Sequence, residues 1–219
     1  MSELAAVLFD MDGLLVDTEP VWTIAEVELA HSFGGEFTPA LKAELVGTRL
    51  EVAVPKIISW YAAPDDPAAV ACTSAWLLAR MVSLFAVDLP VMPGAASLVA
   101  ACRAAPVPVA LVSSSYRVLV DAVLAHRIGP FDLTLAGDEV EHGKPHPEPY
   151  LTAASRLGVD PARCVVLEDS PSGVASGEAA GCAVVAVPSV AGVVFDPAPR
   201  RLVLPSLAGV SVGDLVALV

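Results

Sequence analysis

Basic residues are scarce in this chain of 219 residues, which has 12 lysines and arginines against 25 aspartates and glutamates. The formal net charge is therefore -13 at neutral pH. Proteins that bind nucleic acid build their affinity on clustered cations, so this composition argues against a nucleic acid partner. We expect any anionic ligand to be small.

Cysteine pairs, long apolar runs and a basic leader are also missing. The cysteines form no C-x-x-C pair, so their spacing indicates neither a zinc site nor a redox motif and predicts buried free thiols at Cys72, Cys102, Cys164 and Cys182. No apolar run approaches the roughly 18 residues of a membrane span, and the N-terminus resembles no secretory signal. We expect a soluble, cytoplasmic monomer with no membrane contact.

Short apolar runs that end in polar residues recur along the chain and predict buried strands at 5–10, 107–115, 164–170 and 182–189. Segments of helical character separate them. This alternation predicts an α/β fold, a doubly wound parallel sheet. In such sheets ligands bind beyond the carboxyl ends of the strands, which is where Asp10, Ser113 and Asp169 would lie.

One stretch interrupts the alternation. Between about residues 18 and 87 no strand-like run occurs, whereas apolar residues recur at helical spacing. We predict a helical cap domain at 17–87, inserted after the first strand of an α/β core that comprises 1–16 and 88–219. Such a domain, joined by two linkers, can close over a site as a lid. The segment "DPAPRRLVLPSL" predicts a loop and an edge strand.

The stretch "LFDMDG" places Asp10 and Asp12 directly after the first strand. If Asp169 lies near them, two carboxylates about 5 Å apart repel by roughly 3 kcal/mol at an effective dielectric near 20. These carboxylates need a cation beside them, or one of them must keep a proton. A hard divalent ion such as Mg²⁺ would compensate Asp10 and Asp169. Asp12 could then stay protonated as a general acid.

Besides these carboxylates, the sequence offers hydroxyl groups and a lysine, which can bind negatively charged oxygens. The run "LVSSS" ends a strand with the hydroxyl and N–H groups of Ser113 and Ser114, which could bind phosphate oxygens. Lys144 in "HGKPHPE" offers a point charge to a phosphoryl group. A carboxylate nucleophile, a divalent cation, hydroxyls and a lysine together indicate phosphoryl transfer.

Two histidines flank this lysine. His142 and His146 are four residues apart, which suits a metal pair on a helix, but the intervening "GKP" disfavours a helix there and favours ordinary loop histidines. We interpret Arg80, in the last long helix of the cap, as a surface charge.

Four motifs in order resemble those of the haloacid dehalogenase superfamily, in its helical-cap branch of sugar-phosphate phosphatases and β-phosphoglucomutases. They are "DMDGLLVDTE" (10–19), "VSSS" (112–115), "GKPHPEPY" (143–150) and "LEDSPSGVASGEAAG" (167–181). With the cap, the resemblance covers nearly the whole chain and implies a Rossmann-like core.

The resemblance implies a role for each matching residue. Asp10 would attack phosphorus, and Asp12 would protonate the leaving oxygen and later activate water. Ser113 and Lys144 would hold the phosphate. Mg²⁺ would be bound by Asp10, by the backbone carbonyl of Asp12 and by Asp169, with Glu168 nearby. An acid at position 12 also separates the chain from the dehalogenases proper, which lack it.

Residues of the cap are expected to choose the substrate. "VGTR" resembles the specificity loop of this branch, so Gly47 and Arg49 are candidates for substrate contact, although an arginine just before a helix is commonly solvated. Glu19 would lie at the entrance to the cap. Trp22 could line the substrate pocket or anchor the first cap helix, and it occupies the place of a histidine in β-phosphoglucomutases.

The sequence thus predicts a Mg²⁺-dependent phosphatase that hydrolyses a small phosphorylated metabolite, a hexose phosphate of the 2-deoxyglucose 6-phosphate type. The alternatives are a β-phosphoglucomutase-type mutase and a receiver-like signalling module. A receiver also combines acidic residues, a phosphorylated aspartate, a hydroxyl and a lysine on a parallel sheet. The D-x-D pair followed by a helical insertion is foreign to receivers.

Overall fold

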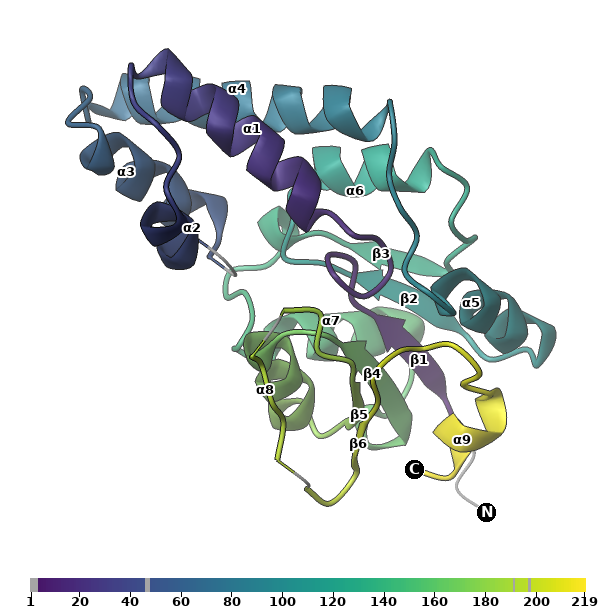
Figure 1. Ribbon diagram of the computed structural model, residues 1–219. Helices are drawn as coiled ribbons and strands as arrows, with labels where there is room; N and C mark the ends of the chain where they lie inside the picture. The colour runs from purple at the N-terminus through teal and green to yellow at the C-terminus, as the bar shows by residue number, and fades with distance from the viewer. Residues whose placement is uncertain (1–3, 46–47, 191, 197) are drawn as a thin grey trace. The chain divides into compact units, whose positions relative to one another are not determined.

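The computed structural model describes residues 4–45, 48–190, 192–196 and 198–219 of the protein. These residues form two compact units (Figure 1). One comprises Met1–Asp17 with Pro90–Val219, and the other is Thr18–Leu89.

The larger unit is built on a six-stranded sheet in the order β3-β2-β1-β4-β5-β6, and every strand pairing in it is parallel. The strands are β1 (Ala6–Phe9), β2 (Val109–Val112), β3 (Leu133–Leu135), β4 (Cys164–Glu168), β5 (Ala183–Ala186) and β6 (Arg201–Val203). The predicted α/β fold is confirmed, and β1, β2, β4 and β5 occur where the apolar runs predicted strands. β3 escaped prediction because it has only three residues, two of them half-buried.

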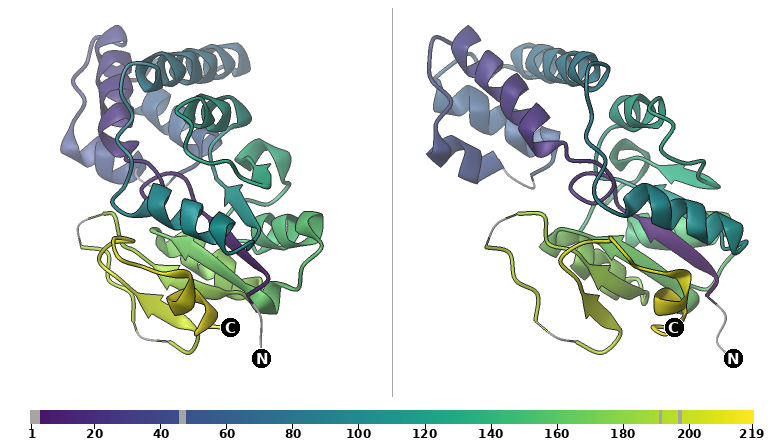
Figure 2. Two further views of the ribbon diagram at one scale, coloured as in Figure 1. Left: turned by 90° about the vertical axis from the view of Figure 1, so that its right-hand side faces the viewer. Right: turned by 45° about the vertical axis from the view of Figure 1, so that its right-hand side comes forward.

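Helices cover both faces of this sheet (Figure 2). They are α5 (Ala95–Ala104), α6 (Arg117–Leu124), α7 (Glu148–Leu157), α8 (Pro171–Ala179) and α9 (Val212–Val216). Alternate strand residues such as Leu8 and Val166 join Tyr150 of α7 and Val174 of α8 in one buried cluster. Because β1 lies between β2 and β4, the loops that follow these three strands emerge side by side.

The smaller unit is helical in the part that the structure describes. It contains α1 (Glu19–Ser32), α2 (Pro39–Leu45), α3 (Leu50–Trp60) and α4 (Pro67–Phe85). We predicted bounds of 17 and 87 for this segment. Leu77, Met81 and Phe85 of α4 are buried where α4 packs against α1 and α3. Arg80 forms two hydrogen bonds of 2.6 Å with the Glu28 carboxylate of α1.

The prediction that no apolar stretch approaches the length of a membrane span was wrong. The 19-residue helix α4 is long and apolar enough to cross a membrane by length and composition, which is weak evidence when one helix passes this test. Alanine, small polar residues and a tryptophan are interspersed with its larger apolar residues. The apolar residues therefore show helical spacing and no continuous apolar run, although Arg80 is the only charged residue from Pro67 to Phe85.

The cysteine prediction holds for three of the four residues. Cys102, Cys164 and Cys182 are buried free thiols, but Cys72 is exposed. Burial raises the pKa of Cys102 and of Cys164 to about 11 and that of Cys182 to about 12. Cys72 differs because it lies on an outward-facing position of α4, where the apolar composition of the helix gave no sign of exposure.

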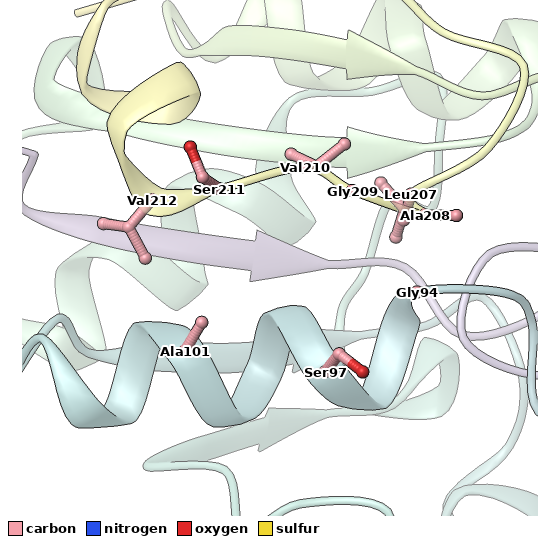
Figure 3. Close-up of a pocket in the computed structure, with 9 residues that line it drawn as sticks. All are labelled: Gly94, Ser97, Ala101, Leu207, Ala208, Gly209, Val210, Ser211 and Val212. Carbon is pink, nitrogen blue, oxygen red and sulfur yellow. The ribbon is translucent and has the colours of Figure 1, made fainter.

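A pocket of about 510 Å³ opens between α5 and the segment 207–212 of the larger unit (Figure 3). Its walls are Gly94, Ser97 and Ala101 on one side and that segment on the other. Gly94 has a φ of +85°, and a Cβ there would overlap the backbone of Leu207. No charged side chain lines this pocket, so it offers no group for acid–base or metal chemistry.

Candidate active site

The loop after β1 holds the first pair of carboxylates. Asp10 remains in register with the sheet, since its N–H donates to the Leu167 carbonyl at 3.0 Å, and its side chain is buried. The chain then turns at Gly13, whose φ is +82° and whose N–H donates to the Val16 carbonyl at 2.8 Å. A Cβ at Gly13 would overlap the Asp169 carboxylate. A glycine is therefore required here by both conformation and space.

Two hydroxyl groups from the end of β2 hold Asp12. Ser113 and Ser115 both donate to Oδ2 of Asp12, at 3.2 and 2.8 Å. Ser114 lies between them in sequence and is exposed. Ser115 was missed by the sequence reasoning, although side chains alternate along an extended chain, which places residues 113 and 115 on the same side.

Lys144 links two of the acids. Its side chain is 3% exposed, and its Nζ donates to Asp10 Oδ1 at 2.5 Å, Glu168 Oε1 at 2.7 Å and the Val112 carbonyl at 2.9 Å. Burial lowers the pKa of Lys144, but the charges of Asp10 and Glu168 outweigh it and raise that pKa above its ordinary value. The lysine is therefore a fixed positive charge at the end of β1.

Glu168 ends β4 with a fully buried carboxylate. Besides Lys144, the Tyr150 hydroxyl donates to its Oε1 at 2.7 Å, and the hydroxyl of Ser170 donates to its Oε2 at 3.1 Å. Burial and the charge of Glu168 raise the pKa of Tyr150 well above its usual value, so the phenol stays a donor. Tyr150, like Ser115, was not singled out by the sequence, because a tyrosine in a helical pattern is an ordinary core residue.

Gly173 of α8 leaves room for this carboxylate. A Cβ at position 173 would overlap the Glu168 carboxyl group, which is fixed by five donors. We expect Gly173→Ala to push Glu168 away from Lys144 and to cost about 1–3 kcal/mol in the free energy of unfolding, as overpacking does. Urea unfolding monitored by circular dichroism measures this cost.

Gly213→Ala in α9 is the matched control, because a Cβ there meets the Ser211 Oγ only at 3.5 Å. Alanine in that helix should leave stability unchanged or raise it by up to about 1 kcal/mol. Equal stability of the two variants would show that the Glu168 carboxylate moves freely, contrary to the packing described.

Three buried carboxyl groups lie close together at this edge of the sheet. Asp10, Glu168 and Asp169 each offer an oxygen within 4.8 Å of the others. Burial, with the charge of Glu168, raises the pKa of Asp10 well above its ordinary value and that of Asp169 to about 7. The Ser189 hydroxyl donates to Asp169 and acts in the opposite direction.

This cluster fits a hard divalent cation. Three acids face the single positive charge of Lys144, so negative charge is in excess when all are ionised. The available ligand atoms are carboxylate oxygens, which Mg²⁺ prefers over nitrogen or sulfur. The acidic cluster could therefore bind a metal ion.

The predicted cap residues that the structure describes belong to the helical unit. Glu19 pairs with Lys42 at 2.8 Å, and Lys42 also pairs with the buried Glu26 at 3.0 Å. Trp22 of α1 is half-buried, and Arg49 precedes α3 with its Nε 3.7 Å from Glu51 Oε2. Gly47 lies outside the described residues. Sequence reasoning had not singled out Lys42 as the partner of Glu19.

Residues 4–181 match the model of the haloacid dehalogenase-like hydrolase family. The chain belongs to this family. The resemblance drawn from the four motifs is thereby confirmed, including the helical-cap branch of phosphatases and β-phosphoglucomutase-like proteins.

Several curated relatives of the chain are phosphatases. Hexitol phosphatase B of Escherichia coli K12 is 33% identical over 192 residues, which cover 85% of each chain. The fructose-1-phosphate phosphatase YqaB of the same organism is 32% identical over 180 residues, covering 81% of this chain and 93% of that protein.

A solved structure extends the likeness to nearly the full length. CbbY from Rhodobacter sphaeroides, in complex with phosphate, is 28% identical with a TM-score of 0.82, covering 97% of this chain and 99% of that one. Together these findings make the chain a phosphatase of the haloacid dehalogenase-like family. The match to a hydrolase family argues against the receiver-like alternative, a module in which phosphorylation drives partner binding and not substrate turnover.

Proposed function

We propose that this phosphatase hydrolyses phosphate esters of six-carbon sugars or sugar alcohols, in a Mg²⁺-dependent reaction through a phosphoaspartate at Asp10. The observation that carries the proposal is the junction of β1, β2 and β4. There one lysine is bonded to Asp10 and one carboxylate, Asp12, is bonded by two serine hydroxyls. The hexitol and fructose 1-phosphate phosphatases among its relatives support the substrate class.

Asp10 is the proposed nucleophile. Lys144 bonds to Oδ1, and we assign the attack on phosphorus to Oδ2. The bond from Oδ2 to phosphorus forms while the bond from phosphorus to the ester oxygen of the sugar breaks. The aspartyl phosphate thus divides one difficult displacement into two easier ones.

Asp12 is the proposed proton carrier. Its Oδ2 accepts from Ser113 and Ser115, which hold the carboxyl group in place, and we assign to this carboxyl group the proton that passes to the departing sugar oxygen. In the second step the ionised Asp12 takes a proton from water as the water oxygen attacks phosphorus. Phosphate then leaves, and the Asp10 carboxylate is restored. One carboxyl group serves as acid and then as base.

The phosphoryl group would be held by Lys144 and by the hydroxyl and N–H groups at the end of β2, from Ser113 and Ser114. Lys144 neutralises charge on the phosphoryl oxygens when the substrate competes for its ammonium group. Mg²⁺ would be held by Asp10, Asp169 and the Asp12 carbonyl, with Glu168 beside them. When bound, the metal offsets the negative charge of the acids and the phosphate.

Metal binding should depend on pH in a defined way. Burial raises the pKa of Asp169 to about 7, so below neutrality a proton competes with Mg²⁺ for this carboxylate. We expect Mg²⁺ affinity to fall at least about tenfold per pH unit below that pKa, because burial also raises the pKa of Asp10, the second carboxylate ligand. Calorimetry in two buffers of different ionisation enthalpy should detect proton release on binding. Affinity that is constant across this range would contradict the assignment of Asp169 as a ligand.

The helical unit Thr18–Leu89 is proposed as the cap that selects the substrate, with Glu19, Trp22, Gly47 and Arg49 as the candidate contacts. Trp22 in place of a mutase histidine favours water as the final acceptor. The ion pairs of Lys42 with Glu19 and Glu26 join the first half of α1 to α2 and so position this part of the cap.

The substrate class is tested by measuring phosphate release from a panel of sugar phosphates with excess Mg²⁺. Hexose and hexitol phosphates should give the highest kcat/KM, and nucleotides and glycolate phosphate much lower values. Conversion of β-glucose 1-phosphate to glucose 6-phosphate, faster than inorganic phosphate appears, would identify a mutase. Equal rates across the panel would remove the sugar assignment and leave a phosphatase of broad range.

A further inference from the structure

A second group of metal-binding side chains lies on the surface of the larger unit. His142, His146 and Glu148 each offer one ligand atom, and these atoms lie within 4.8 Å of one another. The Nδ1 of His142 is 2.9 Å from Glu148 Oε2, and the Nδ1 of His146 is 4.0 Å from the same oxygen. The two imidazole rings lie 4.6 Å apart between centroids.

Backbone hydrogen bonds hold the residues of this cluster in place. The N–H groups of Glu141 and His142 donate to the two Glu148 oxygens, at 2.8 and 2.9 Å. Glu148 is the first residue of α7, so the helix start is joined to the loop before it. On the other side of the loop, the buried Ser176 hydroxyl donates to the His146 carbonyl at 2.6 Å.

The side chains retain the freedom that metal binding needs. His142 is 56% exposed, His146 is 51% exposed and Glu148 is 26% exposed. A tetrahedral zinc ion with bonds near 2.1 Å holds its ligands about 3.4 Å apart, so small rotations of the imidazoles complete the set. If both histidines bind through Nδ1, His142 exchanges its 2.9 Å hydrogen bond with Glu148 Oε2 for the metal, and His146 gives up a long one, 3.2 Å from the Glu148 N–H.

We propose that His142, His146 and Glu148 bind a zinc ion at a site separate from the acidic cluster of Asp10. Two imidazoles with one carboxylate are a zinc donor set, whereas the three carboxylates of the other cluster suit a hard ion. The sequence spacing suggested a metal pair only if the segment were helical. The loop achieves the same convergence without a helix.

Zinc at this position would fasten the loop that carries Lys144. Lys144 lies between the two histidines in sequence, and its side chain extends inward to Asp10 and Glu168. A zinc ion bonded to residues 142, 146 and 148 would close a short ring of chain around it. The backbone that positions Lys144 would then be fixed from the surface as well as from the site.

The test measures zinc binding by the full-length protein with millimolar Mg²⁺ present to fill the oxygen-ligand site. Zn²⁺ affinity is obtained by competition with a chromophoric chelator, and Co²⁺ is added separately for its visible spectrum. The variants are His142→Asn and His146→Asn, and His31→Asn is the matched control because His31 is an exposed histidine on α1 of the helical unit.

We expect the protein and the His31→Asn control to bind one Zn²⁺ that His142→Asn and His146→Asn lose. The loss should exceed about 100-fold in affinity, because even indirect partners of a metal ligand are worth 10–100-fold. Co²⁺ should give a four-coordinate visible spectrum only in the first two proteins. Asp169→Asn should keep this site and its spectrum. Equal zinc affinity in all the variants, or a spectrum lost in Asp169→Asn and kept in His142→Asn, would overturn the proposal.

Discussion

Asp10→Asn should reduce phosphate release by more than about 1000-fold, as the loss of an enzyme nucleophile does. The amide is not nucleophilic toward phosphorus, so the first displacement has no attacking oxygen. The protein should remain folded, because the Lys144 ammonium group keeps its bonds to Glu168 and to the Val112 carbonyl. Initial rates and thermal unfolding, measured on the same preparation, separate the two effects.

Asp65→Asn is the matched control for this variant. Asp65 is an exposed aspartate in the loop before α4 and belongs to the helical unit. The same chemical change there should alter activity by less than about twofold, since substitutions at such surface positions are nearly neutral. An Asp10→Asn protein that turns over at a tenth of the original rate would remove Asp10 as the nucleophile.

Lys144→Met should both abolish activity and destabilise the fold. Removing the lysine leaves the Asp10 and Glu168 carboxyl groups facing each other without a cation in a buried site. Breaking such a buried pair costs about 3–5 kcal/mol of stability. Urea unfolding gives the cost, and phosphate release gives the effect on turnover.

Two comparisons isolate the cause of that loss. Lys56→Met is the control, because the half-buried Lys56 donates to the Glu44 carbonyl and forms no ion pair with a described residue, so its loss should cost less than about 1 kcal/mol. Adding Glu168→Gln to Lys144→Met should recover part of the lost stability, since the double variant has one buried charge fewer. Glu168→Gln could instead lower the stability of Lys144→Met by as much as it lowers the stability of the original protein. That result would show that the two residues are not coupled.

Much of the architecture was predictable because it rests on local patterns. Apolar runs ending in polar residues marked β1, β2, β4 and β5, and the parallel order of the sheet then placed three strand ends side by side. Asp10, Ser113 and Asp169 were expected together for that reason. Short or half-buried elements such as β3 and α2 left no comparable pattern.

The contacts that tune the site could not be predicted, because they depend on packing between distant segments. Ser115 and Asp12 are 103 residues apart in sequence, and Tyr150 reaches Glu168 across 18 residues. The bond from Ser189 to Asp169 likewise joins the loop after β5 to the end of β4. Cys72 was misjudged for the same reason, since composition does not say which side of α4 meets its neighbours.

Trapping the phosphorylated enzyme tests the mechanism most directly. Radiolabelled p-nitrophenyl phosphate is mixed with the protein and quenched in acid, and borohydride then converts an aspartyl phosphate into homoserine. The nitrophenolate leaves without a proton, so Asp12→Asn should still be phosphorylated but should hydrolyse slowly and accumulate label. We predict labelled protein, more in Asp12→Asn than in the original chain, with homoserine found by mass spectrometry at position 10. No trapped phosphate in either protein, or reduction at a residue other than Asp10, would contradict the proposed mechanism.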